Sequence, residues 1–445
     1  MIARYTLPEM ASIWSEERKL ETWLDVELAI VDALSKEGTV PEEAARRIRE
    51  SARFDIARVK DLESVTKHDV LSFVECVCES LGEDSCYFHM GVTSSDVLDT
   101  SLAILMRDSI NIVLDELRAV KDLIAELARK HECTLTIGRT HGMHAEPTSL
   151  GLKFAVWYND FTRAVQRIER ARDEVCVGKV SGAVGNYSHF PPGVEDTALG
   201  SLGLDPERPA TQVVQRDRHA FLLATLALAA AVMEKVAVEL RHLQRTEVAE
   251  MEEPFTPGQK GSSSMPHKRN PITLERITGL ARLVRAHAAA GFENVALWHE
   301  RDISHSSVER VIIPDSTTVV HYMARCLKQV LDGLEVNAAK MRQNIDLTHG
   351  LIYSQRLMIC LMEAGWQRIR AYEKVQALAG LTASGGQDLK EVSMADEEVT
   401  GLIGADVLEG VFDPGFYIRH AHTILTDAGI TPQGNNPGKA RAERG

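Results

Sequence analysis

The sequence lacks the cysteine patterns of a secreted or zinc-stabilised protein. Its seven cysteines are odd in number and contain no C-x-x-C pair, so neither a disulfide framework nor a structural zinc site is predicted, and a reducing compartment is expected. The N-terminus lacks a basic head followed by an apolar run, and no stretch reaches the ~18 uninterrupted apolar residues of a membrane span. We therefore expect a cytoplasmic protein with no membrane partner.

A surplus of basic residues is also absent. The chain has 64 acidic and 50 basic residues, a formal charge of −14, which argues against general binding of nucleic acid or anionic membranes. An anionic small substrate stays compatible with this charge, because a cleft can be locally basic on an acidic protein. The chain has 445 residues, 44% of them apolar, which predicts large buried cores and about three domains. A chain of this length is typical of an enzyme.

Period-two strand patterns are almost absent, whereas long helical patterns are common. From Met106 to Leu127 apolar residues recur at alternating steps of four and three, which is a heptad seam. A second apolar stripe covers 150–175. A third helix is predicted from about 217 to 251, and its segment 221–233 is apolar all round, so burial on every side is expected. Two more helices are predicted at about 272–295 and 307–336, the latter with Pro314 as a kink or an early-turn residue.

These patterns predict an all-α fold of three helical domains. Shorter helices fill an N-terminal domain over 1–95 and a C-terminal domain over 351–431, and a central long-helix bundle over 96–350 lies between them. The proline- and glycine-rich residues 432–445 are predicted to be a disordered tail.

Polar residues gather in four clusters at the ends of the predicted helices: 66–69, 91–96, 139–147 and 261–271. The first fits a capping box and the second a helix start that suits a carboxylate, although either could simply end a helix. His141 and His144 have an i, i+3 spacing, but no third zinc ligand accompanies them, so no metal is predicted. A flexible linker does not explain the two prolines, lysine and arginine in 261–271.

Helix length suggests that these clusters meet only in an oligomer. Thr93 and His141 bracket one helix of about 33 residues, which at 1.5 Å per residue separates them by roughly 45–50 Å. Gln212 and Ser262 bracket the third long helix, with a similar separation. One site containing all four clusters must therefore be shared between subunits. The apolar seams supply surfaces for an obligate homo-oligomer.

The segment G-S-S-S-M-P-H-K-R-N-P at 261–271 resembles the signature loop of the fumarase/aspartase superfamily. Further segments, at 4–5, 67–69, 138–148, 215–219 and 298–307, resemble the adenylosuccinate lyase family within it. The similarity extends from residue 1 to about 431. It implies a homotetramer with a central core of about twenty helices and four sites, each built from three subunits. It also implies fumarate release from adenylosuccinate, giving AMP, and from succinylaminoimidazole carboxamide ribotide, with no cofactor.

The resemblance assigns roles to particular residues. A β-elimination needs a base beside a carboxylate, cations for the charge that builds there, and an acid for the departing nitrogen. Residue types alone would make a histidine the base; the family pattern instead gives Ser262 as base and His141 as acid, with Glu275 orienting His141. A serine base requires a loop that closes and surrounds the alkoxide with donors.

The remaining assignments concern binding. Lys268 is implied to stabilise the carboxylate intermediate, and His68 to hydrogen-bond the substrate. The residues implied to hold the succinyl carboxylates are Asn270, Thr93, Ser94, Thr140 and Gln212. The residues that match phosphate-binding positions are Arg4, Tyr5, Arg301, Ser306 and Arg310, because guanidinium forks fit phosphate oxygens. Lys67, Asp69 and Arg276 complete the binding set; Lys67 stands where many relatives have arginine, and Arg276 is a ribose or base contact at a variable position.

The sequence is also compatible with alternative functions. Argininosuccinate lyase and carboxymuconate cycloisomerase are related enzymes, but neither needs the arginine-rich phosphate set. A catalytically silent helical scaffold is the alternative of a different class. Intact Ser262, His141 and Lys268 argue against a scaffold.

Overall fold

The structure is a computed structural model that describes residues 1–256, 258–262 and 264–430. The tail predicted at 432–445 lies outside the described residues. The chain forms two compact units, each made of three segments. Unit 1 contains Met1–Val120, Phe161–Ala237 and Glu275–Lys328, and unit 2 contains Lys121–Asp160, Val238–Leu274 and Gln329–Gly445. The three-domain division with boundaries near residues 95 and 350 stays a prediction.

Unit 1 begins with short helices, as the sequence predicts. They enclose a core that includes Trp23, Phe73 and Phe88, each at most 5% exposed. Besides the bundle helices, unit 1 contains η1 (Ala3–Tyr5), α1 (Pro8–Ile13), the longer α2 (Glu16–Lys36), α3 (Glu42–Ser51), α4 (Ile56–Thr66), α5 (Asp69–Cys78), η2 (Gly82–Tyr87), α8 (Pro192–Leu202) and the parallel strand pair β3 (Val177–Gly178) with β4 (Asp205–Pro206). Pro41 directly precedes α3 and Glu42 and Glu43 lie in its first turn, as expected for the positive end of a helix dipole.

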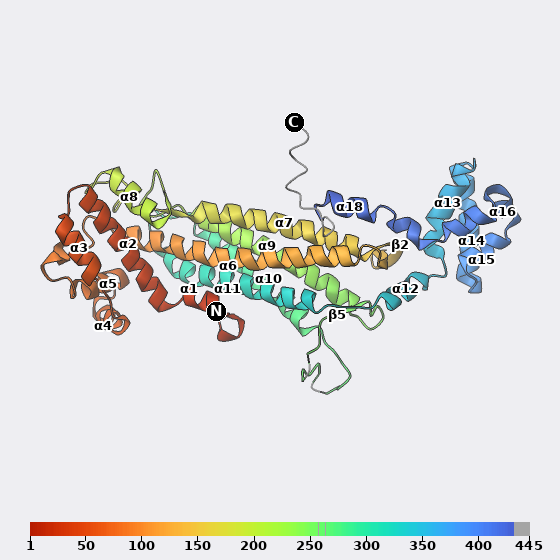
Figure 1. The fold of residues 1–445 in the computed structure, drawn as a ribbon, viewed down its shortest axis with the longest axis horizontal. Coiled ribbons are helices and arrows are strands. Elements are labelled where there is room, and N and C mark those ends of the chain that lie inside the picture. The colour runs from red at the N-terminus through yellow and green to blue at the C-terminus, as the bar shows by residue number, and fades with distance from the viewer. Residues whose placement is uncertain (257, 263, 431–445) are drawn as a thin grey trace. The chain divides into compact units, whose positions relative to one another are not determined.

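Five long helices form a bundle (Figure 1): α6 (Ser94–Lys130), α7 (Leu150–Val175), α9 (Arg216–Leu243), α10 (Ile272–Glu293) and α11 (Ser304–Asp332). Unit 1 contains the larger part of each helix. Side-chain contacts join each helix to the next in a closed ring, through Arg118 and Glu169, Arg170 and Phe221, Glu234 and Arg285, Arg276 and Tyr322, and Arg325 and Glu116. Pro314 lies inside α11.

The heptad seam predicted on α6 is confirmed. Its residues from Met106 to Ile124 are fully buried, and Leu127 is 8% exposed. The stripe predicted on α7 is also buried throughout, from Leu150 to Val175. Because α6 is one unbroken helix of 37 residues, it is about 55 Å long.

Two expectations for α9 are wrong. The helix ends at Leu243 rather than near residue 251, because the chain turns there to carry Glu250 into the interior, where its carboxylate meets Arg139. Nor is the apolar segment buried on all sides, since Phe221 is 37% and Leu228 53% exposed within the chain. By length and composition α9 could cross a membrane, but half of its most apolar window is buried, as in the core helices of soluble proteins.

Unit 2 contains a β-hairpin that the sequence patterns did not predict, formed by β1 (Leu135–Thr140) and β2 (Met143–Ser149). A shorter antiparallel pair joins β5 (Met251–Glu252) and β6 (Glu335–Val336). The C-terminal helices pack around Leu357, Leu389 and Leu408, which are fully buried. These elements are α12 (Ala338–Asp346), η3 (Leu351–Tyr353), α13 (Ser354–Glu363), α14 (Arg368–Gly385), α15 (Leu389–Ala395), α16 (Glu397–Ile403), α17 (Ala405–Val411), η4 (Pro414–Ile418) and α18 (Ala421–Asp427).

Candidate active site

The first polar cluster is a corner between two helices of unit 1. The sequence predicts a capping box that places Lys67 and His68 in a first turn, and this is wrong. Helix α4 ends at Thr66, Lys67 is in the left-handed conformation with a φ of 57°, and His68 is the N-cap of α5. Its imidazole Nδ1 accepts the backbone N–H of Leu71 at 3.2 Å. This bond puts the proton of the neutral ring on Nε2.

The second cluster begins α6. The backbone N–H of Thr93 donates to Asp96 at 2.7 Å, which fixes the entry to the helix before Ser94. The other carboxylate oxygen of Asp96 accepts from Lys179, and both side chains are completely buried. Because a buried charge is costly without a partner, this ion pair anchors the start of α6 to the chain around residue 180.

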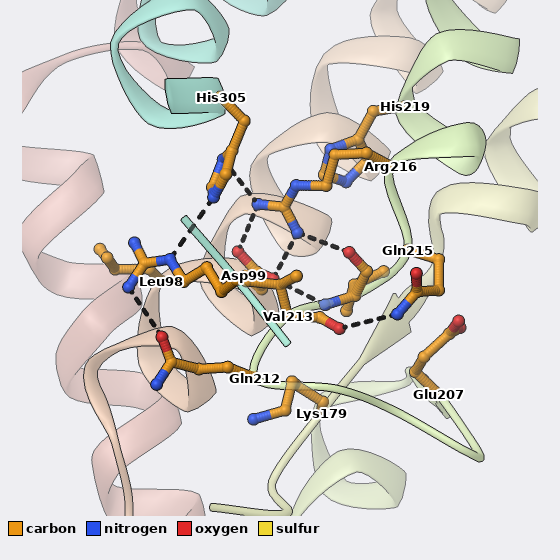
Figure 2. A network of polar contacts seen from close by, with 12 residues as sticks. Leu98, Asp99, Lys179, Glu207, Gln212, Val213, Gln215, Arg216, His219 and His305 are labelled. Carbon is orange, nitrogen blue, oxygen red and sulfur yellow. Dashed lines mark hydrogen bonds and ion pairs between the residues drawn. The ribbon is translucent and has the colours of Figure 1, made fainter. Parts of the chain in front are cut away.

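A network of buried charges lies at one end of the bundle in unit 1 (Figure 2). Arg216 donates to both oxygens of Asp99, at 2.6 and 2.8 Å, and to both oxygens of Glu309, at 3.1 Å. His219 contacts Glu309 at 3.3 Å. Burial alone would raise the pKa of Asp99 and of Glu309, but the charges and hydrogen bonds of Arg216 and His219 outweigh burial and lower both pKa values.

This network reaches a predicted substrate residue. His305 contacts Glu309 at 3.2 Å through Nδ1, and its Nε2 accepts from the Nε–H of Arg301 at 3.5 Å. Another nitrogen of Arg301 donates to the amide oxygen of Gln212 at 3.0 Å. The structure therefore brings together Arg301, a predicted phosphate-binding residue, and Gln212, a predicted carboxylate-binding residue. Figure 2 shows the side chains of Gln212 and His305. The buried charges behind His305 restrain the guanidinium plane.

A cavity of about 360 Å³ opens beside this network within unit 1. Three predicted phosphate-binding residues, Arg301, Ser306 and Arg310, line it. All three lie at or just before the beginning of α11, on successive turns of the chain. Lys19 from α2 also lines the cavity. The lining presents four cationic side chains, three serine hydroxyl groups and three carboxylates. Because the carboxylates of Asp99 and Glu309 are paired with Arg216, the guanidinium groups of Arg301 and Arg310 are the lining groups that suit an anion with several oxygens.

One further pair of predicted residues meets in unit 1, and another pair shares Tyr322 as a neighbour. Arg310 forms an ion pair with Asp69; burial opposes ionisation, but this hydrogen bond and charge hold the pKa of Asp69 below its usual value. Arg276 donates to the hydroxyl group of Tyr322 at 2.9 Å, and the ring of Tyr5 packs on Tyr322 with centroids 5.3 Å apart. Arg4, next to Tyr5, is exposed.

The third cluster, expected in a simple turn, forms the β1–β2 hairpin of unit 2. Thr140 pairs with Met143, so His141 and Gly142 are the two turn residues, with φ values of 55° and 78°. Positive φ at both positions is the requirement of a type I′ turn, which matches the twist of a hairpin. A side chain at the first of them is exposed at the hairpin tip, and His141 and Thr140 are both exposed. The turn therefore presents His141 outward.

The fourth cluster, the signature loop, also belongs to unit 2. A Cβ atom on Gly261 would lie 2.1 Å from the carbonyl oxygen of Lys268, so only glycine permits the loop to close on itself there. The hydroxyl oxygen of Ser262 accepts the backbone N–H groups of Met265 at 3.1 Å and Ser264 at 3.4 Å. Lys268 is exposed and Asn270 half-buried.

The predicted residues fall into two groups by unit. Thr140, His141, Ser262, Lys268 and Asn270 belong to unit 2, and the other predicted residues belong to unit 1. Glu275 and His141 thus lie in different units, and the orienting role of Glu275 stays a prediction.

Sequence reasoning missed the buried residues that hold this machinery, among them Asp96, Asp99 and Glu309. One signal could have found the first two. Extended backward from Met106 in steps of three and four, the heptad seam of α6 reaches Ala103, then Asp99, then Asp96. A carboxylate on an apolar seam is buried and therefore needs a cationic partner.

Comparison with known proteins identifies the relatives of the chain. Residues 3–286 match a lyase family model, and residues 350–428 match the model of the adenylosuccinate lyase C-terminus. The adenylosuccinate lyase of Thermotoga maritima is 50% identical over 425 residues, which is 96% of this chain and 99% of the relative. The adenylosuccinate lyase of Aquifex aeolicus is 48% identical over 423 residues, 94% of this chain and 97% of the relative.

Solved structures of related enzymes share the fold. A fumarate lyase from Mesorhizobium sp. BNC1 has a TM-score of 0.88 and 27% identity, covering 96% of this chain and 99% of that one. A 3-carboxy-cis,cis-muconate lactonizing enzyme from Pseudomonas putida has a TM-score of 0.87 and 28% identity, covering 96% and 97%. The chain therefore belongs to the adenylosuccinate lyase family, a family of carbon–nitrogen lyases in the fumarase/aspartase superfamily.

Proposed function

We propose that the chain releases fumarate from two succinylated purine-pathway nucleotides at sites shared among the subunits of a homotetramer. The substrates are adenylosuccinate, which gives AMP, and succinylaminoimidazole carboxamide ribotide. The observation that carries this assignment is the cavity lined by Arg301, Ser306 and Arg310, since both substrates carry a phosphate. Named relatives with about 50% identity over nearly the whole chain support it.

Ser262 acts as the base that removes the proton beside a succinyl carboxylate. A serine hydroxyl is far too weakly acidic for this role unless its alkoxide is stabilised. The two backbone N–H groups that reach Ser262 Oγ, from Met265 and Ser264, are donors of the kind that stabilise an oxyanion. Lys268 and Asn270, on the same loop, bind the carboxylate on which negative charge builds.

His141 acts as the acid that protonates the departing nitrogen. Its exposed place at a hairpin tip gives the imidazole access to a substrate held elsewhere. Glu275 orients it. Thr140, Thr93, Ser94 and Gln212 bind the carboxylates.

Binding of the nucleotide uses the unit 1 residues. Arg4, Tyr5, Arg301, Ser306 and Arg310 bind the phosphate, where arginine forks match its oxygens. Lys67, Asp69 and His68 contact the substrate from the corner between α4 and α5, with the Nε2–H of His68 as a donor. Arg276 contacts the ribose or base.

The length of the helices supports shared sites. Helix α6 is unbroken over 37 residues between Ser94 and Lys130, so a 55 Å element separates Thr93 from the hairpin of His141 along the chain. Subunits that pack side by side with opposite helix directions would bring such ends together. The exposed apolar residues on α9, Phe221 and Leu228, suit such packing.

The assay compares three substrates by ultraviolet absorbance: adenylosuccinate, argininosuccinate, and fumarate with water. Turnover of adenylosuccinate alone is expected. Turnover of argininosuccinate alone would overturn the substrate assignment, and turnover of none would favour a non-catalytic scaffold.

Subunit mixing tests the catalytic roles and the shared sites. His141→Ala and Ser262→Ala should each abolish turnover in a folded oligomer. After subunit exchange, the mixture should regain part of the activity, because some sites then combine an intact hairpin with an intact loop. No gain after confirmed exchange would contradict shared sites.

A further inference from the structure

Glu250 and Glu253 are two carboxylates three residues apart, in the segment that joins α9 to the signature loop. Glu250 is completely buried and Glu253 is 5% exposed. Short strand β5, Met251–Glu252, lies between them and pairs with β6. Buried carboxylates are rare without partners. The partners of Glu250 and those of Glu253 lie in different elements.

Glu250 contacts the hairpin. Arg139 donates to both carboxylate oxygens, at 2.6 and 3.1 Å, in the bidentate geometry that fixes both side chains. Asn344 of α12 donates to the same carboxylate at 2.7 Å. Asn344 also donates to the carbonyl of Val248 at 2.9 Å. Ala249 adopts a φ of 50°, a conformation that L residues avoid, and this turn directs the next side chain inward.

The contact with Arg139 lies immediately below the hairpin tip. Arg139 directly precedes Thr140 and His141, and it is paired across the hairpin with His144. A register shift between Ile137 and Arg139 interrupts the ladder at this level, so the strands alone hold the tip less firmly. The Glu250 carboxylate supplies the missing restraint, because it binds Arg139, the second-last residue of β1 before the turn.

Glu253 contacts the other catalytic element. Its two carboxylate oxygens accept the backbone N–H groups of Thr273 at 3.3 Å and Leu274 at 3.2 Å. These are first-turn groups of α10, which begins just after the signature loop, and such groups have no partner within the helix. Gln244 adds a second tie, since it accepts the backbone N–H of Glu253 at 3.1 Å and donates to the carbonyl of Arg269 at 3.2 Å.

We propose that Glu250 and Glu253 are positioning residues that act on opposite halves of the reaction. Glu250 holds the hairpin that carries the acid His141, and Glu253 holds the end of the loop that carries the base Ser262. This inference rests on the proposed roles of His141 and Ser262 and on the sharing of sites between subunits.

The first measurement separates positioning from binding. Glu250→Gln and Glu253→Gln keep the size of the side chain and remove its charge. Each should lower kcat at least tenfold and raise KM by a smaller factor, because the phosphate-binding residues of unit 1 are untouched, whereas the carboxylate-binding residues Thr140, Lys268 and Asn270 belong to the displaced elements. Glu247→Gln, an exposed glutamate of the same segment, should retain the wild-type kcat. A wild-type kcat in both buried variants would overturn the proposal.

Subunit mixing then assigns each defect to one half. Glu250→Gln mixed with Ser262→Ala should gain activity above the sum of the two, because one variant supplies an intact loop and the other an intact hairpin. Glu250→Gln mixed with His141→Ala should gain none, since neither supplies an intact hairpin. Glu253→Gln should give the reverse result. Its mixture with His141→Ala should gain activity, because one variant supplies an intact hairpin and the other an intact loop, and its mixture with Ser262→Ala should gain none.

A merely structural role predicts a different pattern, in which both partners rescue each variant equally or neither partner does. Either result would overturn the proposal, provided that the mixture of His141→Ala with Ser262→Ala gains activity. If that control mixture fails, the shared-site proposal is what has failed. Hydrogen exchange then still tests the inference: backbone amides at 135–149 should exchange faster in Glu250→Gln but not in Glu253→Gln, and equal exchange in both would contradict it.

Conservative variants cover the case in which a glutamine variant does not fold. Arg139→Lys alters the same ion pair at its hairpin partner: it keeps the positive charge and loses the bidentate guanidinium contact. It should give the rescue pattern of Glu250→Gln. Glu253→Asp keeps the charge but shortens the reach to α10, and it should give the pattern of Glu253→Gln. The opposite assignment in either variant would contradict the proposal.

Discussion

Both terminal nitrogens of Arg216 donate hydrogen bonds to the carboxylate of Asp99, at 2.6 and 2.8 Å, and both side chains are buried. This fork joins α6 to the beginning of α9, and through Glu309 it also joins α11. Three long helices are therefore fixed to one another by charge at the place where Arg301 is restrained. The pair has consequences for stability that depend on pH.

Asp99→Asn should destabilise the folded chain at pH 7 and flatten its response to acid. Removing one partner of a buried ion pair costs about 3–5 kcal/mol. Because the pKa of Asp99 is lower in the folded chain than in the unfolded one, its contribution is complete above the unfolded value of ~4 and is lost as the pH falls through the folded value. Wild type should therefore lose more stability than Asp99→Asn on acidification below about pH 4.

Urea unfolding at pH 7 and at several lower pH values measures this difference. Asp122→Asn, at an exposed position of α6, serves as the control and should follow wild type at every pH. Equal stability of Asp99→Asn and wild type at pH 7 would contradict the importance of the buried pair.

Arg301→Lys should weaken substrate binding more than it slows the reaction. Lysine keeps the positive charge but loses the fork that reaches Gln212 and His305 at once. Losing a hydrogen bond to a charged group costs about 1.5–3 kcal/mol, so KM should rise about tenfold or more. Steady-state kinetics with adenylosuccinate give both constants. Arg368→Lys, at an exposed site on α14, should leave them unchanged, and a lower kcat at constant KM would contradict a binding role.

Gly261→Ala should inactivate the enzyme without unfolding it. The new methyl group would lie 2.1 Å from the Lys268 carbonyl oxygen, so the loop must open and displace Ser262. A shift of about 1 Å in a reacting group costs on the order of 100-fold in rate. The melting temperature should stay close to that of wild type because most of the loop is exposed.

Gly279→Ala is the matched control, since a methyl group there meets nothing within 4 Å. In the interior of α10 this change should leave kcat unaltered and stabilise the helix by about 0.5–1 kcal/mol. A fully active Gly261→Ala enzyme would show that the closed loop is dispensable.

Leu228→Lys should disrupt the oligomer and its activity together. Leu228 is 53% exposed on the apolar helix α9, and a charge there would have to be buried if another subunit covers that face. Light scattering coupled to size exclusion measures the mass of the assembly. Val65→Lys, at an 81% exposed position of α4, should change neither the mass nor the rate. An intact, active Leu228→Lys oligomer would place the subunit contact elsewhere.

The helical seams could be predicted from the sequence because burial within the chain determines their spacing. The positions from Met106 to Leu127 recur with the helical period, and each packs against neighbouring helices of the same chain. The apolar run of α9 misled this reasoning at Leu228, because an apolar side chain indicates that it will be buried somewhere but does not indicate whether its partner belongs to the same chain.

The hairpin of His141 escaped prediction for a different reason. The ladder between its strands is interrupted after Ile137, and polar residues occupy both faces of β2, so no clean alternation of polar and apolar residues appears. His68 was misassigned because a capping box is defined by the spacing of Thr66 and Asp69, whereas in the structure the imidazole itself is the cap. Such local competition between capping groups is settled by the packing of α4 on α5, which the sequence does not display.

The two-residue turn at His141 and Gly142 restricts how the chain can evolve in length. Inserting one residue between Thr140 and Met143 would either lengthen the tip, and so displace His141, or shift the register of the hairpin. A register shift by one residue would move every later residue of β2 to the opposite face, and Arg139 would lose its alignment with His144. Insertions and deletions should therefore be excluded from 139–144 across functional descendants of this chain, even where surface loops of the same protein vary freely.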